Sequence, residues 1–201
     1  MTARPHHFAA IVGGAIAGSV AREVFADHGI KVLVIEQNDR PYGKIEDGLP
    51  RWHLEQRKQE YRRIDARLNK PGVFFLPRTK LGRDLDFQDL STNRGFSVVV
   101  LANGAWRDRE LGIPGAEEFI GKGLVYQNPF LYWYNHRNEE GYIGPRYQSP
   151  EEAEVVGGGL ASIRVVKVLQ LENNERALRA HGVQTDVYEL EKKGIPAVCK
   201  M

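Results

Sequence analysis

Residues 9–37 read AAIVGGAIAGSVAREVFADHGIKVLVIEQ, and this stretch decides the fold. The apolar run Phe8–Val12 ends in glycines, which is typical of a buried parallel strand. A helix is expected from Gly18 onward, with Gly29 as its natural C-cap. A second β-branched run, IKVLVI, then ends at Glu36. This order predicts a right-handed βαβ unit with parallel strands.

The turn between the first strand and the helix has the features of a diphosphate-binding loop. Gly13 allows a sharp turn out of the strand, and Gly18 allows the helix to pack closely against it. The free N–H groups and positive dipole end of the helix would face an anion there. Glu36 closes the second strand, where an acidic side chain accepts hydrogen bonds from ribose hydroxyls. Ala15 replaces the usual middle glycine while Gly14 retains backbone freedom; a glycine-rich turn without a ligand is the alternative.

The chain continues the α/β pattern after this unit. Residues 41–50 are expected to form a loop, and residues 51–69 a polar amphipathic helix. Apolar runs at 72–76 and 96–104 indicate two further strands. We therefore expect an α/β fold in which residues 1–104 form a Rossmann-like domain with a parallel sheet.

The second half of the chain has a less regular pattern. Residues 105–152 are rich in Gly, Pro, Asn and aromatic residues, which indicates a functional segment or a crossover between domains. Residues 154–171 repeat the order of strand, glycine-rich turn and helix, and another strand is expected at 185–190. Residues 153–201 would then be the start of a second, incomplete Rossmann-like domain, because a full βαβ unit takes at least ~30 residues and must be followed by another unit.

Composition and charge exclude several classes of protein. With 28 basic and 26 acidic residues the net charge is +2, so the sequence does not indicate a basic surface that binds nucleic acid. No apolar run reaches the ~18 residues that a membrane span needs. The single Cys199 excludes an internal disulfide. A signal-peptide core at residues 8–21 is disfavoured because only Arg4 precedes it as a firm positive charge, so a cytoplasmic location is expected.

Several motifs occur in a fixed order along the chain. They are IVGGAIAGSVA…VLVIEQ, RPYGKIEDGLP (40–50), VVVLANGAWRDRELGIPG (98–115), YWYNH (132–136) and VVGGGLASIRVVKV (155–168). In this order the chain resembles the two-dinucleotide flavoprotein reductases, most closely the adrenodoxin/ferredoxin–NADP reductases and the small subunit of glutamate synthase. The resemblance covers nearly the whole chain but only the N-terminal part of such an enzyme. Asn103 and Arg164 depart from it, since the family has Thr and often an acid there.

The resemblance implies an oxidoreductase that binds FAD and NAD(P)H. It implies FAD contacts at Gly13, Gly14, Ala17, Gly18, Glu36, Lys44, Ala102 and Gly104, and nicotinamide-nucleotide contacts at Gly157, Gly159, Leu160 and Ala161. A hydride would pass from the nicotinamide to the flavin, and electrons would leave to an unknown acceptor, a small molecule or an electron-transfer protein. No side-chain nucleophile is required for this chemistry or evident in the sequence, and the catalytic residues stay unknown. No metal site is expected, because the six histidines show no ligand spacing.

Several alternatives stay open at this point. Lys192 and Lys193 would favour NADP, whereas Glu189 and Glu191 would favour NAD. The aromatic stretch 126–134 fits packing, cover for a cofactor or base stacking, in that order, and His136 beside it fits a packing role. We expect the chain to be an N-terminal fragment of such an enzyme or a truncated gene product. A non-catalytic nucleotide-binding remnant, which associates through exposed edges, is the alternative function.

Overall fold

The computed structural model describes residues 7–198, which divide into two compact units. Unit 1 comprises Met1–Glu46 and Glu55–Ala105, and unit 2 comprises Asp47–Leu54 and Trp106–Met201. Cys199 lies outside the described residues. None of the helices within residues 7–198 combines the length and the apolar character that a membrane span requires.

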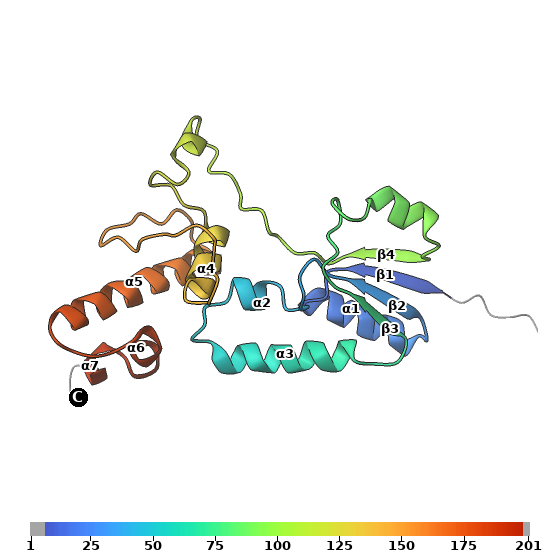
Figure 1. Cartoon of the computed structure of the whole chain (residues 1–201), viewed down its shortest axis with the longest axis horizontal. Helices are drawn as coiled ribbons and strands as arrows, with labels where there is room; N and C mark the ends of the chain where they lie inside the picture. The colour runs from blue at the N-terminus through green and yellow to red at the C-terminus, as the bar shows by residue number, and fades with distance from the viewer. Residues whose placement is uncertain (1–6, 199–201) are drawn as a thin grey trace, which may run out of the picture. The chain divides into compact units, whose positions relative to one another are not determined.

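Unit 1 is built on a four-stranded parallel sheet (Figure 1). Its strands are β1 (Phe8–Val12), β2 (Lys31–Ile35), β3 (Val73–Leu76) and β4 (Val98–Leu101), in the spatial order β3-β2-β1-β4. The register pairs Val12 with Ile35 of β2 and with Leu101 of β4. The chain moves outward from β1 to β3 and then returns to the other side of β1, so a topological switch point lies between β1 and β4. The α/β fold with a parallel sheet is confirmed.

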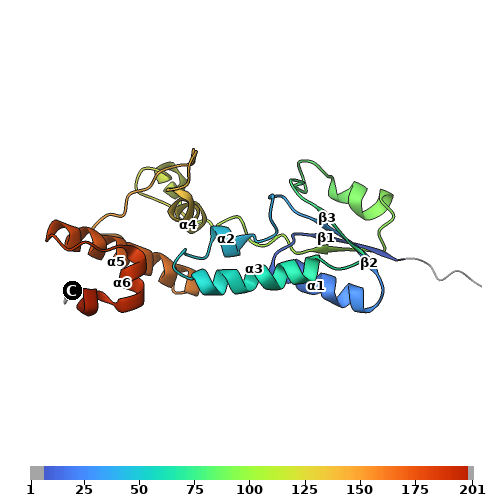
Figure 2. The same ribbon diagram turned by 60° about the horizontal axis from the view of Figure 1, so that its bottom comes forward.

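Both faces of this sheet are covered, which explains why β1 is apolar throughout. Figure 2 shows α1 (Ile16–Asp27) and α3 (Leu54–Leu68) on one side of the sheet and the segment 81–96, with a π-helical turn at Asp89–Asn93, on the other. The first face buries Ala9, Ile11, Val32 and Val34 against Ala21, Phe25 and Leu68, and the second buries Ala10, Val12, Ile35 and Leu90 against Leu81, Leu85 and Phe96. Alternate residues of one strand therefore serve two different cores.

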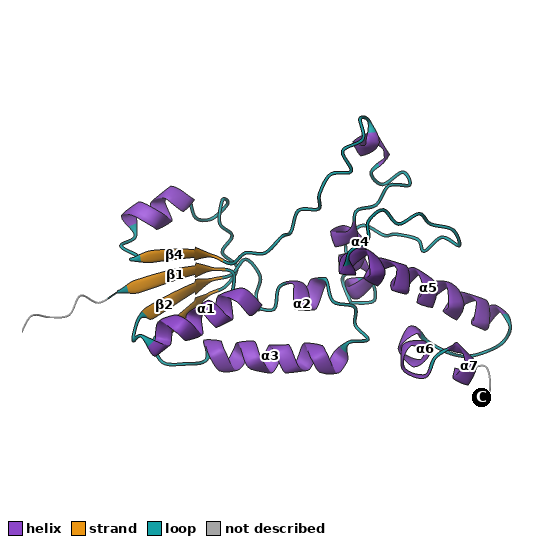
Figure 3. Cartoon of the chain, turned by 180° about the vertical axis from the view of Figure 1, so that it is seen from behind, coloured by secondary structure: helices purple, strands orange, loops and turns teal. Residues whose placement is uncertain are grey.

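The regular elements of unit 2 within the described residues are all helical, and Figure 3 shows no strand there. Its elements are a 3₁₀ turn (Ala116–Phe119), α4 (Gln127–His136), α5 (Leu160–Ala180), α6 (Val187–Lys193) and α7 (Ile195–Val198). The largest apolar cluster packs Phe130, Leu131, Trp133 and Tyr134 of α4 against Val168 of α5. The aromatic stretch 126–134 thus contributes a helix that packs in a core. This agrees with packing, the first of the three roles expected for it.

Four expectations about secondary structure were wrong, in whole or in part. The loop at 41–50 contains the short helix α2 (Lys44–Asp47), and the irregular segment 105–152 contains α4. The apolar positions Phe130, Trp133 and Tyr134 recur at helical spacing, so the sequence carried a signal for α4. No strand forms at 154–156 within the described part of unit 2, because no neighbouring strand is there to pair its backbone N–H and C=O groups.

The expectation of a strand at 185–190 is also wrong, because α6 begins within this stretch. Local chemistry explains the helix. The Asp186 side chain accepts a hydrogen bond from the Glu189 N–H at 2.8 Å, which caps the N-terminus. Lys192 and Lys193 occupy the last turn, where positive charge complements the helix dipole, and Gly194 follows with φ +78°.

The cap of α6 gives a first test. Replacing Asp186 with alanine removes the acceptor for the Glu189 N–H, so the free energy of unfolding should fall by about 1 kcal/mol. Asp186→Asn keeps an acceptor and should lose much less. Urea denaturation followed by circular dichroism at 222 nm measures both variants, and equal stability of the two would contradict the capping role.

Candidate dinucleotide-binding site

The candidate site begins at Gly13, at the carboxyl end of β1 and beside the topological switch point. Gly13 has φ +99°, a left-handed conformation that favours glycine. A Cβ atom added at Gly13 would lie 2.4 Å from the carbonyl oxygen of Ala102, the residue that follows β4. A Cβ atom added at Gly18 would lie 1.8 Å from the carbonyl oxygen of Gly13. The turn therefore has no room for a side chain at either position.

Glu36 links the end of β2 to this turn. Its Oε2 accepts a hydrogen bond from the Gly14 N–H at 2.9 Å, and its Oε1 accepts one from the Asn38 N–H at 3.1 Å. The residue is 4% exposed. An ionised carboxylate has about four acceptor positions, so two lone pairs remain for a further partner. The structure thus holds an acidic acceptor beside the glycine-rich turn.

Ala15 occupies a position of this turn where the backbone has a negative φ. Its backbone has φ −70° and ψ −152°, an extended conformation with negative φ, so this position does not require glycine. Ala15 is also the N-cap of α1, where its side chain supplies no hydrogen bond, and no acidic residue lies in the first turn. The positive end of the helix dipole is therefore left without a negative side chain of its own helix.

The structure brings together most of the residues that we expected to contact FAD. Gly13, Gly14, Gly18, Glu36 and Ala102 meet at the carboxyl ends of β1, β2 and β4. Ala17 is exposed in the first turn of α1. Gly104, with φ +71°, is exposed two residues beyond Ala102, and Lys44 lies on α2. Motif spacing did not predict two further neighbours of this turn, Asn38 and Pro41. The Cβ of Pro41 lies 2.7 Å from where a Cβ added at Gly14 would be.

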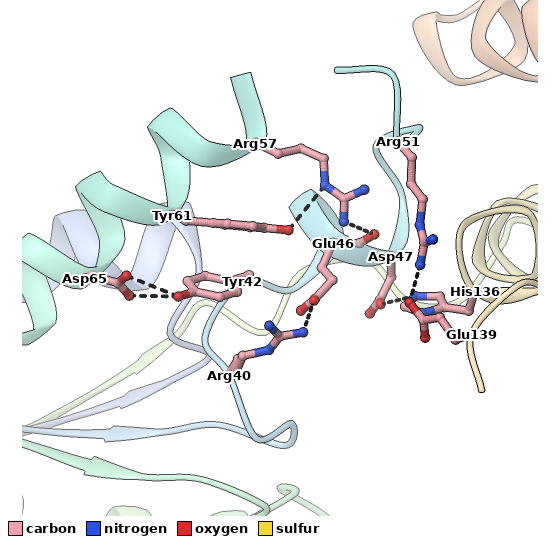
Figure 4. A network of polar contacts seen from close by, with 10 residues as sticks. All are labelled: Arg40, Tyr42, Glu46, Asp47, Arg51, Arg57, Tyr61, Asp65, His136 and Glu139. Carbon is pink, nitrogen blue, oxygen red and sulfur yellow. Dashed lines mark hydrogen bonds and ion pairs between the residues drawn. The ribbon is translucent and has the colours of Figure 1, made fainter. Parts of the chain in front are cut away.

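The segment that carries Lys44 is anchored on α3 by polar contacts within unit 1 (Figure 4). The Tyr42 hydroxyl donates to the Asp65 carboxylate at 3.1 Å, and the Tyr42 and Tyr61 rings stack with centroids 4.0 Å apart. The Arg57 guanidinium donates to the carbonyl oxygen of Glu46 at 3.0 Å and to the Tyr61 hydroxyl at 3.2 Å. Burial, followed by the hydrogen bond to Asp65, raises the pKa of Tyr42. These contacts hold the backbone on both sides of Lys44.

The second glycine-rich loop is more open than the first. Gly157 has φ +122°, and a Cβ added there would lie 2.7 Å from the Ser162 hydroxyl oxygen, the end of a flexible side chain. A Cβ added at Gly158 or Gly159 would meet no atom within 4 Å. Gly159 is the N-cap of α5, and Leu160 is 76% exposed.

A depression of about 430 Å³ adjoins this loop. It is lined by Val155, Gly157, Ser162, Ile163, Val166, Lys167 and Gln170. Ala161, the last of the expected nicotinamide-nucleotide contacts, is partly buried in the first turn of α5. The structure therefore places the four expected residues of this loop next to one another, but in a setting that demands glycine only at position 157.

The fold defines the class: a parallel α/β protein with a glycine-rich turn at its topological switch point. No protein-family model matches the chain. A mitochondrial NADPH:adrenodoxin oxidoreductase of Arabidopsis thaliana is 28% identical over 177 residues, which are 88% of this chain and 35% of the relative. A glutamate synthase [NADPH] small chain of Mycobacterium tuberculosis is 33% identical over 156 residues, 75% of this chain and 30% of the relative.

Solved structures show the same fold. FprA from Mycobacterium tuberculosis in complex with NADPH superposes with a TM-score of 0.58 at 23% identity, over 65% of this chain and 29% of that chain. The chain is thus a homologue of the N-terminal part of the adrenodoxin oxidoreductases and glutamate synthase small chains, which confirms the resemblance seen in the sequence. It spans about a third of the length of the curated relatives it matches.

The steric constraint at Gly18 gives a second test. Glycine to alanine inside a helix normally stabilises by roughly 0.5–1 kcal/mol. Because the alanine methyl group would lie 1.8 Å from the Gly13 carbonyl oxygen, we expect Gly18→Ala instead to lower the free energy of unfolding by about 1–3 kcal/mol. Gly158→Ala, whose methyl group meets nothing within 4 Å, should change it by less than about 0.5 kcal/mol. Urea denaturation compares the two, and a stabilised Gly18→Ala variant would refute the close approach.

Proposed function

We propose that this chain is the FAD-binding part of an oxidoreductase that takes electrons from a nicotinamide nucleotide. The observation that carries the proposal is the turn at Gly13, Gly14 and Gly18, closed by the Glu36 carboxylate at the switch point of a parallel sheet. Such crevices, outside the carboxyl ends of the strands, are where open α/β sheets bind dinucleotides. The relatives named NADPH:adrenodoxin oxidoreductase and glutamate synthase [NADPH] small chain support the same activity.

The residues of unit 1 fit FAD. The turn excludes side chains at Gly13 and Gly18, so the backbone can approach a diphosphate closely. The first turn of α1, with Ala17 and no acidic residue, would direct its N–H groups and dipole at the phosphates. Glu36 would accept hydrogen bonds from the ribose hydroxyls with its remaining lone pairs.

The other proposed contacts of FAD lie around the same edge of the sheet. Ala102 and Gly104 follow β4 across the switch point, and Lys44 would add a cationic side chain from α2. Bound FAD would supply the redox chemistry, while the chain would bind and orient it. Residues 1–104 would then be the N-terminal part of the FAD-binding domain.

The second loop would bind the nicotinamide nucleotide in the same proposal. Gly157, Gly159, Leu160 and Ala161 surround the N-terminus of α5, whose first turn has no acidic residue. Residues 153–201 would be the start of a nucleotide-binding domain, and residues 105–152 the crossover that leads to it. Both NAD and NADP stay possible donors, and the acceptor would be a small molecule or an electron-transfer protein. A cytoplasmic location stays a prediction of the sequence.

A second candidate function has its own supporting observation. Within the described part of unit 2 no strand lies beside the Gly157 loop, and glycine is not required at 158 or 159. This is consistent with a chain that binds a nucleotide without catalysis. The apolar edge strand β3, where Phe74 is 52% exposed, would then be a route to self-association.

Reconstitution separates the two candidate functions. The purified 201-residue chain is incubated with FAD, desalted, and its visible spectrum recorded before and after anaerobic addition of NADPH or NADH. Retained flavin absorbance that bleaches with either nucleotide is the result expected for the oxidoreductase. Retained flavin that neither nucleotide reduces would favour the non-catalytic candidate, and a chain that takes up no FAD would overturn the proposal.

Glu36 provides the residue-level test. Glu36→Ala should weaken FAD binding by roughly 1.5–3 kcal/mol, the value of a hydrogen bond to a charged group, which is about 10- to 150-fold in Kd. Glu36 accepts the Gly14 and Asn38 N–H groups with different carboxylate oxygens, so Glu36→Gln keeps the side-chain volume but only one of these two acceptors. Fluorescence quenching of FAD measures binding, and circular dichroism checks the fold. Unchanged FAD affinity in a folded Glu36→Ala protein would rule out the ribose contact.

A further inference from the structure

Residues 47–54 form a short segment of unit 2 that is flanked in the sequence by residues of unit 1 on both sides. It is held on α4 by side-chain contacts. The buried Asn135 amide donates to the carbonyl oxygens of Asp47 and Leu49 at 3.1 and 3.2 Å. The Trp52 ring meets Tyr134 edge-on, with centroids 5.8 Å apart. The position of this segment therefore depends on α4.

His136, the last residue of α4, adds an ionic contact to the same segment (Figure 4). Its Nε2 lies 3.0 Å from Asp47 Oδ1, and its Nδ1 lies 2.8 Å from Glu139 Oε2. Arg51, from the segment, forms an ion pair with Glu139. The three side chains Asp47, His136 and Glu139 thus form a chain of contacts that ends on Arg51.

The protonation state of His136 follows from these partners. Ionised carboxylates only accept hydrogen bonds, so both ring nitrogens must carry a proton to donate to Asp47 and Glu139. The ring is then a cation beside the Tyr132 ring, with centroids 4.4 Å apart and the two planes tilted by 32°. Neutral imidazole has one N–H and one lone pair, so loss of the proton turns one of the two hydrogen bonds into a repulsion between lone pairs.

The surrounding charges favour the cation. The hydrogen bond to Asp47 is the largest cause that raises the pKa of His136 above 6.5; burial opposes it, and Glu139 reinforces it. Arg51 of the segment pairs with Glu139 in this cluster, and burial lowers the pKa of His53, the other basic side chain of the segment. The next residue of the chain, Arg137, pairs instead with Glu172 on α5. Asp47 and the His136 side chain are 16% and 13% exposed, so solvent screens their contact only in part.

We propose that His136 is a pH-dependent clasp that holds residues 47–54 on α4 while it is protonated and releases Asp47 when it loses its proton. The folded pKa lies above the unfolded one, so the clasp is fully present below about pH 6.5 and is lost as the pH rises through the folded value. The Asn135 hydrogen bonds do not titrate and keep the segment near α4. The clasp therefore changes how often the segment opens, not whether the unit folds, and it does not depend on the proposed FAD site.

The wild-type chain allows a direct measurement. The imidazole of His136, assigned in NMR spectra through the His136→Gln variant, should titrate above 6.5. Asp47→Asn removes the carboxylate whose hydrogen bond raises the pKa of His136 most and should therefore lower that pKa. A value for His136 at or below 6.5 in the wild type, or one that Asp47→Asn leaves unchanged, would overturn the clasp.

Limited trypsin cleavage reports the opening itself, because Arg51 lies within the segment. The rate of cutting after Arg51 is divided by the rate after Arg146, an exposed site of unit 2 that corrects for the pH dependence of trypsin. We expect this ratio to rise on the order of tenfold between pH 6 and pH 9 in the wild type and in the matched control His181→Gln. It should be high and independent of pH in His136→Gln. A flat ratio in the wild type, or the same rise in His136→Gln, would contradict the proposal.

Discussion

The contact between Gly18 and the carbonyl oxygen of Gly13 is the constraint on which unit 1 depends. A Cβ at Gly18 would lie 1.8 Å from that oxygen, so α1 can approach β1 this closely only without a side chain. The same turn brings Gly13 against Ala102 at the end of β4, where a Cβ would lie 2.4 Å from the carbonyl oxygen. Close packing at one corner thus sets the distance from α1 to the sheet and from β1 to β4. It also brings Glu36, at the end of β2, within hydrogen-bonding distance of the Gly14 N–H.

The two glycine-rich loops show how much a similar local sequence depends on its surroundings. The first loop lies between β2 and β4, and the neighbouring strands and Pro41 fill the space around its glycines. The second loop, at 157–159, precedes a long helix, but no strand is described beside it in unit 2. A strand gains its backbone hydrogen bonds only from a neighbour, so the apolar residues before Gly157 form no strand in the described part of this unit. Sequence similarity between the loops therefore did not produce the same supersecondary structure.

Sequence patterns over a few neighbouring residues predicted the secondary structure of unit 1 well and that of unit 2 poorly. All four strands, α1 and α3 were expected near their observed bounds, because their apolar periodicity coincides with burial on both sheet faces. In unit 2 the stretch 185–190 was expected to be a strand, yet it belongs to a helix whose N-terminus is capped by Asp186, which accepts a hydrogen bond from the Glu189 N–H. The aromatic residues of α4 also have helical spacing, but the glycine and proline residues nearby favoured the prediction of an irregular segment. The expected FAD and nicotinamide-nucleotide residues stay predictions, since their positions agree with binding but no ligand contact tests them.

By itself, the sequence determined the βαβ order, the parallel sheet, the acidic residue after β2 and the relationship to the N-terminal part of a family of oxidoreductases. These features depend on local periodicity, on glycine positions and on motif order, which are all readable along the chain. Only the tertiary structure decided that Ala15 can stand in the place of glycine, because φ is negative there. Only the tertiary structure paired His136 with Asp47, 89 positions apart. Such contacts depend on how distant segments pack, and no spacing rule encodes that.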